Sequence, residues 1–149
     1  MAKKYKVGYI AGVFDLFHVG HVNLLRRAKE ECDYLIVGVL SDALVVHFKQ
    51  KPPYIPEEER RQMIEACRYA DQAVIVTEAT IEKMNAWKVY HFDCLFSGDD
   101  YAGNPYWEED KRSLNAVGSN IEFFPYTKST SSTMIKKLIQ KSLESKDDA

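Results

Sequence analysis

Apolar runs of strand length alternate with helical patterns along the chain. The apolar runs predict strands at residues 6–11, 34–40, 73–76, 94–97 and 121–124. Apolar residues recur at helical spacing over residues 19–31, 56–69, 80–90, 106–117 and 131–142. This alternation predicts an α/β fold with one doubly wound, parallel, Rossmann-like sheet of about five strands.

The pattern ends before the chain does. We expect one domain over residues 1–142 and a disordered tail over residues 143–149, which close on a charged stretch. Ligands of doubly wound sheets bind beyond the carboxyl ends of the strands. The functional residues are therefore expected in the loops that follow Ala11, Leu40, Ser97 and Phe124.

Composition narrows the class of protein. The 149 residues are 46% hydrophobic and 28% charged, and 20 basic against 22 acidic side chains give a net charge of -2. That balance argues against non-specific nucleic-acid binding, which needs a basic excess. No apolar run approaches the ~20 residues of a membrane helix, and no signal-peptide core follows the first lysines. The three cysteines are widely spaced, so we expect no disulfide framework and a cytoplasmic protein. Together with the charge balance and the short apolar runs, this predicts a protein without membrane or nucleic-acid partners.

The loop after the first strand carries the most specific chemistry. His18 and His21 stand three residues apart at the start of a helix, so they project from one face beside free N–H groups that bind phosphate. Gly20 between them leaves room for a ligand. These features predict a polyphosphate site that also includes Val13, Phe14 and Asp15. The histidines could instead hold a metal, for which no further ligand is evident, or simply cap the helix.

Other loops at the same edge offer groups for phosphate or nucleotide. Lys49 and Lys51 follow the second strand, Gly98 and Asp99 end the fourth, and hydroxyl residues precede the last helix at Thr127, Ser131, Ser132 and Thr133. Each feature has a plainer alternative: solvated lysines, an Asp turn and a helix N-cap. Three aromatics, Tyr101, Tyr106 and Trp107, could cage a quaternary ammonium group or could serve as packing.

Residues 12–21 resemble the G-x-F-D-x-x-H-x-G-H signature of cytidylyltransferases within the nucleotidyltransferase superfamily. The stretches 49–60 and 68–71 resemble the K-Q-K … Y … E-x-R … R-Y-x-D pattern of bacterial glycerol-3-phosphate cytidylyltransferases. The resemblance implies an enzyme that transfers CMP from CTP to glycerol 3-phosphate, yielding CDP-glycerol and pyrophosphate. It also implies a homodimer, and the chemistry of a nucleoside triphosphate implies that Mg²⁺ accompanies CTP.

The resemblance further implies residue roles. His18, His21 and Lys49 would be catalytic, with Lys49 also contacting the acceptor, while Lys51 and Arg68 would assist phosphate binding or hold the loop. Arg68 and Arg60 equally suit ion pairs on a helix surface. The last loop departs from the family pattern R-T-x-G-I-S-T-[ST], since Tyr126 replaces its arginine. In the same loop Ser129 replaces its glycine and Thr130 its isoleucine.

The sequence leaves alternatives for the acceptor phosphomonoester and for the nucleobase of the nucleotide. Phosphocholine or phosphoethanolamine is the alternative acceptor, bound through Tyr101, Tyr106 and Trp107. An adenylyltransferase of the same fold is a second alternative, and a non-catalytic nucleotide-binding domain is a third.

Overall fold

The fold is a parallel sheet covered by helices on both faces. The computed structural model describes residues 3–125 and 131–147. Its strands are β1 (Tyr5–Gly12), β2 (Cys32–Leu40), β3 (Gln72–Val76), β4 (Cys94–Gly98) and β5 (Asn120–Phe124). Its helices are α1 (Val19–Glu31), α2 (Asp42–Lys49), α3 (Glu57–Glu65), α4 (Lys83–Tyr90), the short 3₁₀ helix η1 (Asp99–Tyr101), α5 (Pro105–Ala116) and α6 (Ser132–Asp147).

The sheet has the order β3-β2-β1-β4-β5, and every neighbouring pair is parallel. The expected doubly wound, Rossmann-like α/β architecture is therefore confirmed. The sequence order reverses between β1 and β4, which makes the carboxyl ends of these two strands the topological switch point. The loop that carries His18 and His21 starts from β1 at this point.

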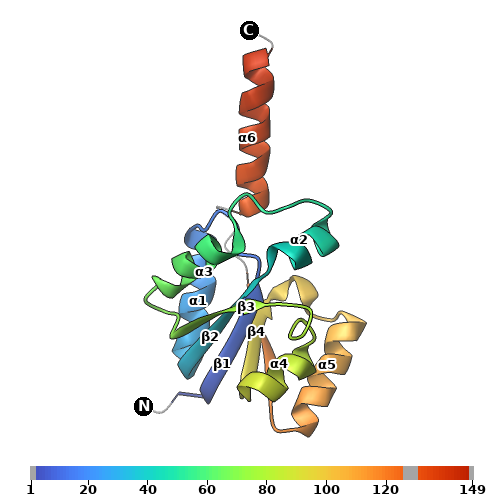
Figure 1. Ribbon diagram of the computed structural model, residues 1–149. Helices are drawn as coiled ribbons and strands as arrows, with labels where there is room; N and C mark the ends of the chain where they lie inside the picture. Colours follow the sequence, from blue (N-terminus) through green and yellow to red (C-terminus); the bar gives the residue numbers. More distant parts are fainter. Residues whose placement is uncertain (1–2, 126–130, 148–149) are drawn as a thin grey trace.

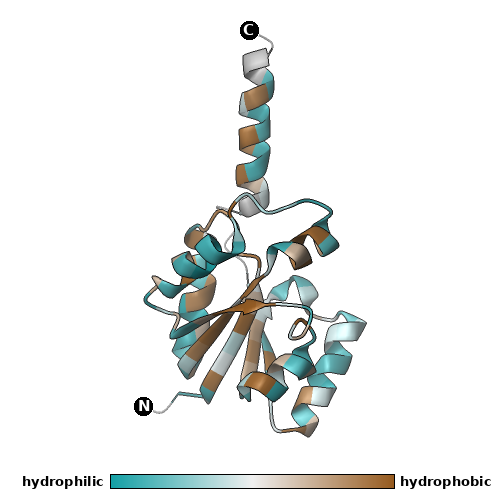
Figure 2. Cartoon of the chain, viewed as in Figure 1, coloured by the Kyte–Doolittle hydropathy of each residue, from teal (hydrophilic) through white to brown (hydrophobic). Residues whose placement is uncertain are grey.

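Alternate strand residues contribute to two hydrophobic cores, one on each face of the sheet, because their side chains point to opposite faces. Ile10 packs with Leu25 of α1 and Ile64 of α3, whereas the adjacent Tyr9 packs with Ala86 of α4 and Leu114 of α5. Figure 1 shows α1 and α3 on one side of the sheet and α4 and α5 on the other. Figure 2 shows the apolar residues concentrated along the strands between these helices.

The helices differ from the predicted ones by more than three residues in three places. Residues 42–49 form α2, where a simple connection was expected, because Ser41 caps the helix and Leu44 and Val45 are buried. Helix α3 ends at Glu65, before the expected residue 69. Helix α6 continues to Asp147 and extends away from the body of the molecule (Figure 1), so residues 143–147 are helical where a disordered tail was expected. No glycine or proline interrupts that stretch.

Within the described part of the chain, none of the helices has the length and apolar character needed to cross a membrane.

Candidate active site

The two predicted histidines form a reciprocal cap at the start of α1. His18 is the N-cap residue, and its Nδ1 accepts a hydrogen bond of 3.0 Å from the Gly20 backbone N–H. The Nδ1 of His21 accepts in turn from the His18 backbone N–H at 3.3 Å. The two rings stack with centroids 3.9 Å apart. Capping and pairing are thus both present, and the expected juxtaposition of the histidines is confirmed.

The caps determine which nitrogen of each ring carries the proton. Since both Nδ1 atoms accept, each neutral imidazole holds its proton on Nε2. Burial lowers the pKa of His18, and burial together with the neighbouring His18 lowers the pKa of His21 to about 4. Near pH 7 the site therefore offers two neutral Nε2–H donors. The His18 Nε2 is buried and has no hydrogen-bond partner among the described residues, which suits an acceptor such as a phosphate oxygen.

These pKa shifts predict how stability depends on pH. The unfolded chain protonates histidine near the ordinary pKa of 6.5, whereas folded His21 stays neutral down to about 4. The unfolded state therefore binds more protons in this window, and the free energy of unfolding should fall as pH drops from 6.5 toward 4. His21→Gln should flatten this slope in urea unfolding curves, and His47→Gln, at an exposed position on α2, should retain it. Parallel profiles for wild type and His21→Gln would contradict the assignment.

The loop before His18 is held in a strained conformation. Phe14 and Leu16 have φ angles of 54° and 52°, in the left-handed region that side chains other than glycine rarely adopt. Between them, the buried Asp15 carboxylate accepts from the backbone N–H groups of Tyr54 at 2.9 Å and Ile55 at 3.0 Å. Asp15 thus orients the backbone of residues 54–55.

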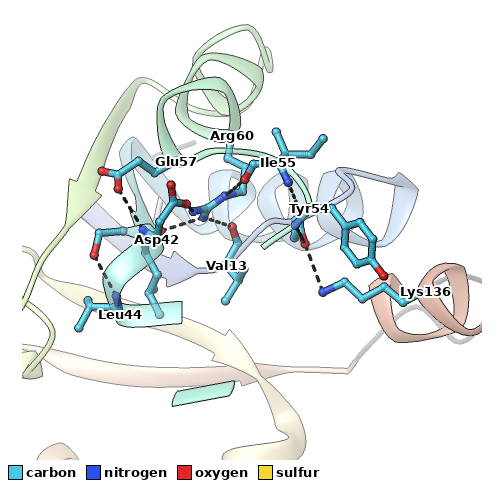
Figure 3. Close-up of polar contacts among 11 residues, drawn as sticks. Val13, Asp42, Leu44, Tyr54, Ile55, Glu57, Arg60 and Lys136 are labelled. Atoms are coloured by element: carbon cyan, nitrogen blue, oxygen red, sulfur yellow. Dashed lines mark hydrogen bonds and ion pairs between the residues drawn. The ribbon is translucent and has the colours of Figure 1, made fainter. Parts of the chain in front are cut away.

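Asp15 also forms an ion pair with a residue that the sequence analysis missed. The Lys136 ammonium, from the second turn of α6, lies 3.2 Å from Asp15 Oδ2 and 5.3 Å from the Tyr54 ring centroid (Figure 3). Burial alone would raise the pKa of Asp15, but the two backbone donors and Lys136 hold it below its usual value. Asp15 is therefore an anion that joins three chain segments. A signal was available, since Lys136 follows the hydroxyl cluster by one helical turn.

Arg60 is a second charged residue that holds this region together. The sequence suited it equally to an ion pair on a helix surface and to a role in the site. Its side chain is 1% exposed. The guanidinium donates to the carbonyl oxygens of Val13 and Leu40, each at 2.8 Å, and of Ile55 at 2.7 Å. It also pairs with Asp42 at 2.6 Å (Figure 3). One cation thereby ties the ends of β1 and β2 to the segment that leads into α3.

Of the two lysines predicted after β2, Lys49 lies close to Asp15 and Lys136. Lys49 is the last residue of α2, so the prediction of a loop there is wrong. Burial and the nearby Lys136 lower the pKa of Lys49, while Asp15 raises it. The structure therefore brings Lys49, Lys136 and Asp15 together. Lys51 lies two residues beyond α2 and is exposed.

Arg68 does not join this group within the chain. It lies in the turn after α3, shortly before β3, and its guanidinium is 5.8 Å from the Tyr69 ring. Asp71 in the same connection pairs with Leu35, near the beginning of β2. Arg68 is thus at the amino-terminal edge of the sheet, opposite the histidines, and the expected contribution to this chain's own nucleotide site is not supported.

The remaining nucleotide candidates lie at the carboxyl edge or outside the described residues. Gly98 ends β4 and Asp99 opens η1, exposed to solvent. Ser131 is an N-cap, since its Oγ accepts from the Met134 N–H at 3.0 Å. Thr133 in the first turn of α6 is exposed. Thr127, like Tyr126, Ser129 and Thr130, and the side chain of Ser132 lie outside the described residues.

The three acceptor aromatics do not form a cage. Tyr101 and Trp107 stack with centroids 4.6 Å apart and an interplanar angle of 11°, whereas Tyr106 is 78% exposed. A lysine that the sequence analysis did not consider, Lys83, lies over the Trp107 ring with its ammonium 3.6 Å from the centroid. The packing alternative is thereby favoured for this group.

No group of three or more histidine, cysteine, aspartate or glutamate side chains suited to a metal exists in residues 3–125 and 131–147. The histidine pair in particular has no third ligand there. Magnesium is therefore proposed only as the ion that accompanies a bound nucleoside triphosphate.

Comparison with known proteins places this geometry in a family. A model described as cytidylyltransferase-like matches residues 9–138. FAD synthase of Thermococcus kodakarensis is 36% identical over 144 residues, covering 95% of this chain and 94% of that protein. Glycerol-3-phosphate cytidylyltransferase of Bacillus subtilis is 33% identical over 129 residues, covering 86% and 92%.

A solved structure shares the fold. The lipopolysaccharide core biosynthesis protein of Thermoplasma volcanium superposes with a TM-score of 0.68 at 24% identity, covering 85% of this chain and 99% of that chain. The matched residues include the loop with His18, the segment with Lys49, and Lys136 of α6. The chain belongs to the cytidylyltransferase-like family of nucleotidyltransferases.

Proposed function

We propose that the protein transfers CMP from CTP to glycerol 3-phosphate and releases pyrophosphate. The observation that carries nucleotidyl transfer is the pair of neutral Nε2–H donors of His18 and His21, fixed at the N-terminus of α1. Lys49 and Lys136 supply positive charge at the same edge. The choice of glycerol 3-phosphate rests on the K-Q-K segment at residues 49–51 and on the Bacillus subtilis relative.

The proposed reaction needs alignment and charge neutralisation rather than a general base. A phosphomonoester has its second pKa near ~6, so near pH 7 it is already a nucleophilic anion. One of its oxygens attacks the α-phosphorus of CTP in line with the bond to the β-phosphate, and that bond breaks as pyrophosphate leaves. His18 and His21 donate to the α-phosphoryl oxygens as negative charge shifts toward the leaving group. Lys49 bridges the two reacting anions.

Lys136 is expected to bind the triphosphate. Lys136 pairs with Asp15, and a polyphosphate beside it would offer further oxygens. A hydrogen bond to a charged group contributes ~1.5–3 kcal/mol, so Lys136→Ala should raise the KM for CTP roughly 10-fold or more. Lys137→Ala changes the adjacent, exposed lysine and should leave KM unchanged. Steady-state kinetics decides, and equal KM values for the two variants would remove Lys136 from the site.

A flavin adenylyltransferase is the second candidate function. The observation in its favour is the likeness to the FAD synthase of Thermococcus kodakarensis, which extends over 95% of this chain. In this reaction ATP replaces CTP and flavin mononucleotide replaces glycerol 3-phosphate. The histidine and lysine roles stay the same, because flavin mononucleotide is also a phosphomonoester.

The deciding experiment measures pyrophosphate release with Mg²⁺ present. CTP and ATP are each combined with glycerol 3-phosphate, phosphocholine, phosphoethanolamine and flavin mononucleotide. Turnover of CTP with glycerol 3-phosphate supports the main proposal, and turnover of ATP with flavin mononucleotide replaces it by the second. CTP binding without turnover of any pair would contradict both and identify a nucleotide-binding domain.

A further inference from the structure

Lys83 and Trp107 form a cation–π contact that the proposed reaction does not use. Lys83 opens α4, and its Nζ lies 3.6 Å from the Trp107 ring centroid and 2.8 Å from Asp110 Oδ2. The Lys83 side chain is only 16% exposed. The ammonium group is therefore held between an aromatic face and a carboxylate, as a bound organic cation would be.

Tyr101 occupies the other face of the Trp107 ring. The two rings are nearly parallel at 4.6 Å, which leaves no room for an ammonium group between them. Lys83 must therefore cover the face that Tyr101 leaves open. Phe123 of β5 lies 5.8 Å from Trp107 with its ring tilted by 51°, and it packs against the core cluster that includes Leu114. Both faces of Trp107 are thus filled by side chains of this chain.

The contact stands at the edge of the sheet where the acceptor is expected. Tyr101 ends η1, which follows β4 directly, and the carboxyl end of β4 adjoins that of β1 at the switch point. An acceptor with an ammonium head group would use an exposed Trp107 face at this position. Lys83 already places a positive charge on that face, and like charges at one site repel.

We propose that Lys83 determines acceptor specificity: its ammonium group fills the cation site on Trp107 and excludes phosphomonoesters whose alcohol part is a cation. The proposal rests on the proposed nucleotidyl transfer to a phosphomonoester and deepens it. It separates anionic or neutral head groups, such as those of glycerol 3-phosphate, from choline and ethanolamine head groups. Lys83 acts here by occupying a site rather than by contacting the reacting atoms.

Binding of tetramethylammonium chloride tests the site without requiring activity. Isothermal titration calorimetry on wild type should show no binding, because Lys83 covers the ring. Lys83→Ala should open the face and leave Asp110 to attract the cation, so affinity should rise at least about 10-fold. Adding Trp107→Leu to Lys83→Ala should abolish that binding. Lys88→Ala, which removes an exposed lysine from the same helix, should behave as wild type.

Lys83→Gln covers the case in which Lys83→Ala does not fold. It removes the charge, retains a hydrogen-bond donor for Asp110, and should likewise gain affinity over wild type. In turnover assays, Lys83→Ala should raise the ratio of kcat/KM for phosphocholine over glycerol 3-phosphate at least about 10-fold.

The proposed nucleotidyl transfer and the proposed role of Lys83 can fail independently. If no substrate pair reacts, nucleotidyl transfer to these acceptors is contradicted, while the tetramethylammonium titration still decides whether Trp107 is a masked cation site. If folded Lys83→Ala or Lys83→Gln binds tetramethylammonium no better than wild type, Lys83 serves only to join α4 to α5. Tight phosphocholine binding by wild type would also overturn the proposal.

Discussion

His18→Asn should lower the turnover number at least about 100-fold while the fold stays intact. The ring has two roles in the proposed mechanism: its Nδ1 caps α1, and its buried Nε2–H donates to the α-phosphoryl group. An asparagine oxygen can replace the Nδ1 acceptor, since asparagine is among the best N-cap residues. It cannot reach the position of Nε2. Losing one donor aimed at developing negative charge costs ~2.7–4 kcal/mol of barrier, which sets the expected loss.

The measurement compares pyrophosphate release at saturating substrates with thermal unfolding by circular dichroism. His18→Ala removes both functions, so it should match His18→Asn in turnover and fall below it in stability, by ~1 kcal/mol for a lost cap. The exposed His47 of α2 serves as the control, and His47→Ala should retain turnover. Near-normal turnover of His18→Asn would refute the catalytic role of His18.

Arg60→Leu should cost at least ~3 kcal/mol of unfolding free energy, the scale expected when three carbonyl oxygens each lose a donor from a buried guanidinium. Leucine fills much of the space but donates nothing. The carbonyl oxygens of Val13, Leu40 and Ile55 would lose their guanidinium donor, and Asp42 would lose its cation. Each buried polar group left unsatisfied costs ~1–3 kcal/mol. Because Val13 precedes the strained Phe14, the histidine loop should loosen as well.

Arg61 provides a matched control one residue further along α3. Its guanidinium pairs with Glu58 and Glu65, both exposed on the helix surface. Ion pairs of that kind contribute little, so Arg61→Leu should change stability only slightly. Urea unfolding of both variants makes the comparison. Similar midpoints for Arg60→Leu and Arg61→Leu would show that the buried network does not hold the loop.

Local sequence patterns were enough to predict the helices and strands whose formation depends on residues close by in the chain. Helix α1 runs from Val19 to Glu31 as its apolar spacing predicts, because one stripe faces the core and the rest faces water. The continuous apolar run of β2 identified a parallel strand that is covered on both faces. The helix at residues 42–49 was missed although Ser41 offers a local cap, and the burial of Leu44 and Val45 that stabilises it depends on packing with distant segments.

Residues whose roles depend on distant partners could not be assigned from spacing. Arg60 and Arg61 are adjacent arginines on one helix, yet one is buried against three carbonyls and the other is on the surface. Lys83 and Trp107 are far apart in the sequence and meet only because α4 and α5 pack on the same face of the sheet.

The alternating α/β plan, the parallel sheet and the paired histidines at the start of α1 could all be predicted, because they follow from periodicity and from interactions within a few residues. Three features became evident in the folded chain alone: Asp15 joins the 54–55 backbone to Lys136, Arg68 lies at the opposite edge of the sheet, and a lysine covers Trp107. Such contacts depend on how crossovers bring remote segments together, and side-chain charge or aromaticity along the chain does not specify which partner will lie within a few ångströms.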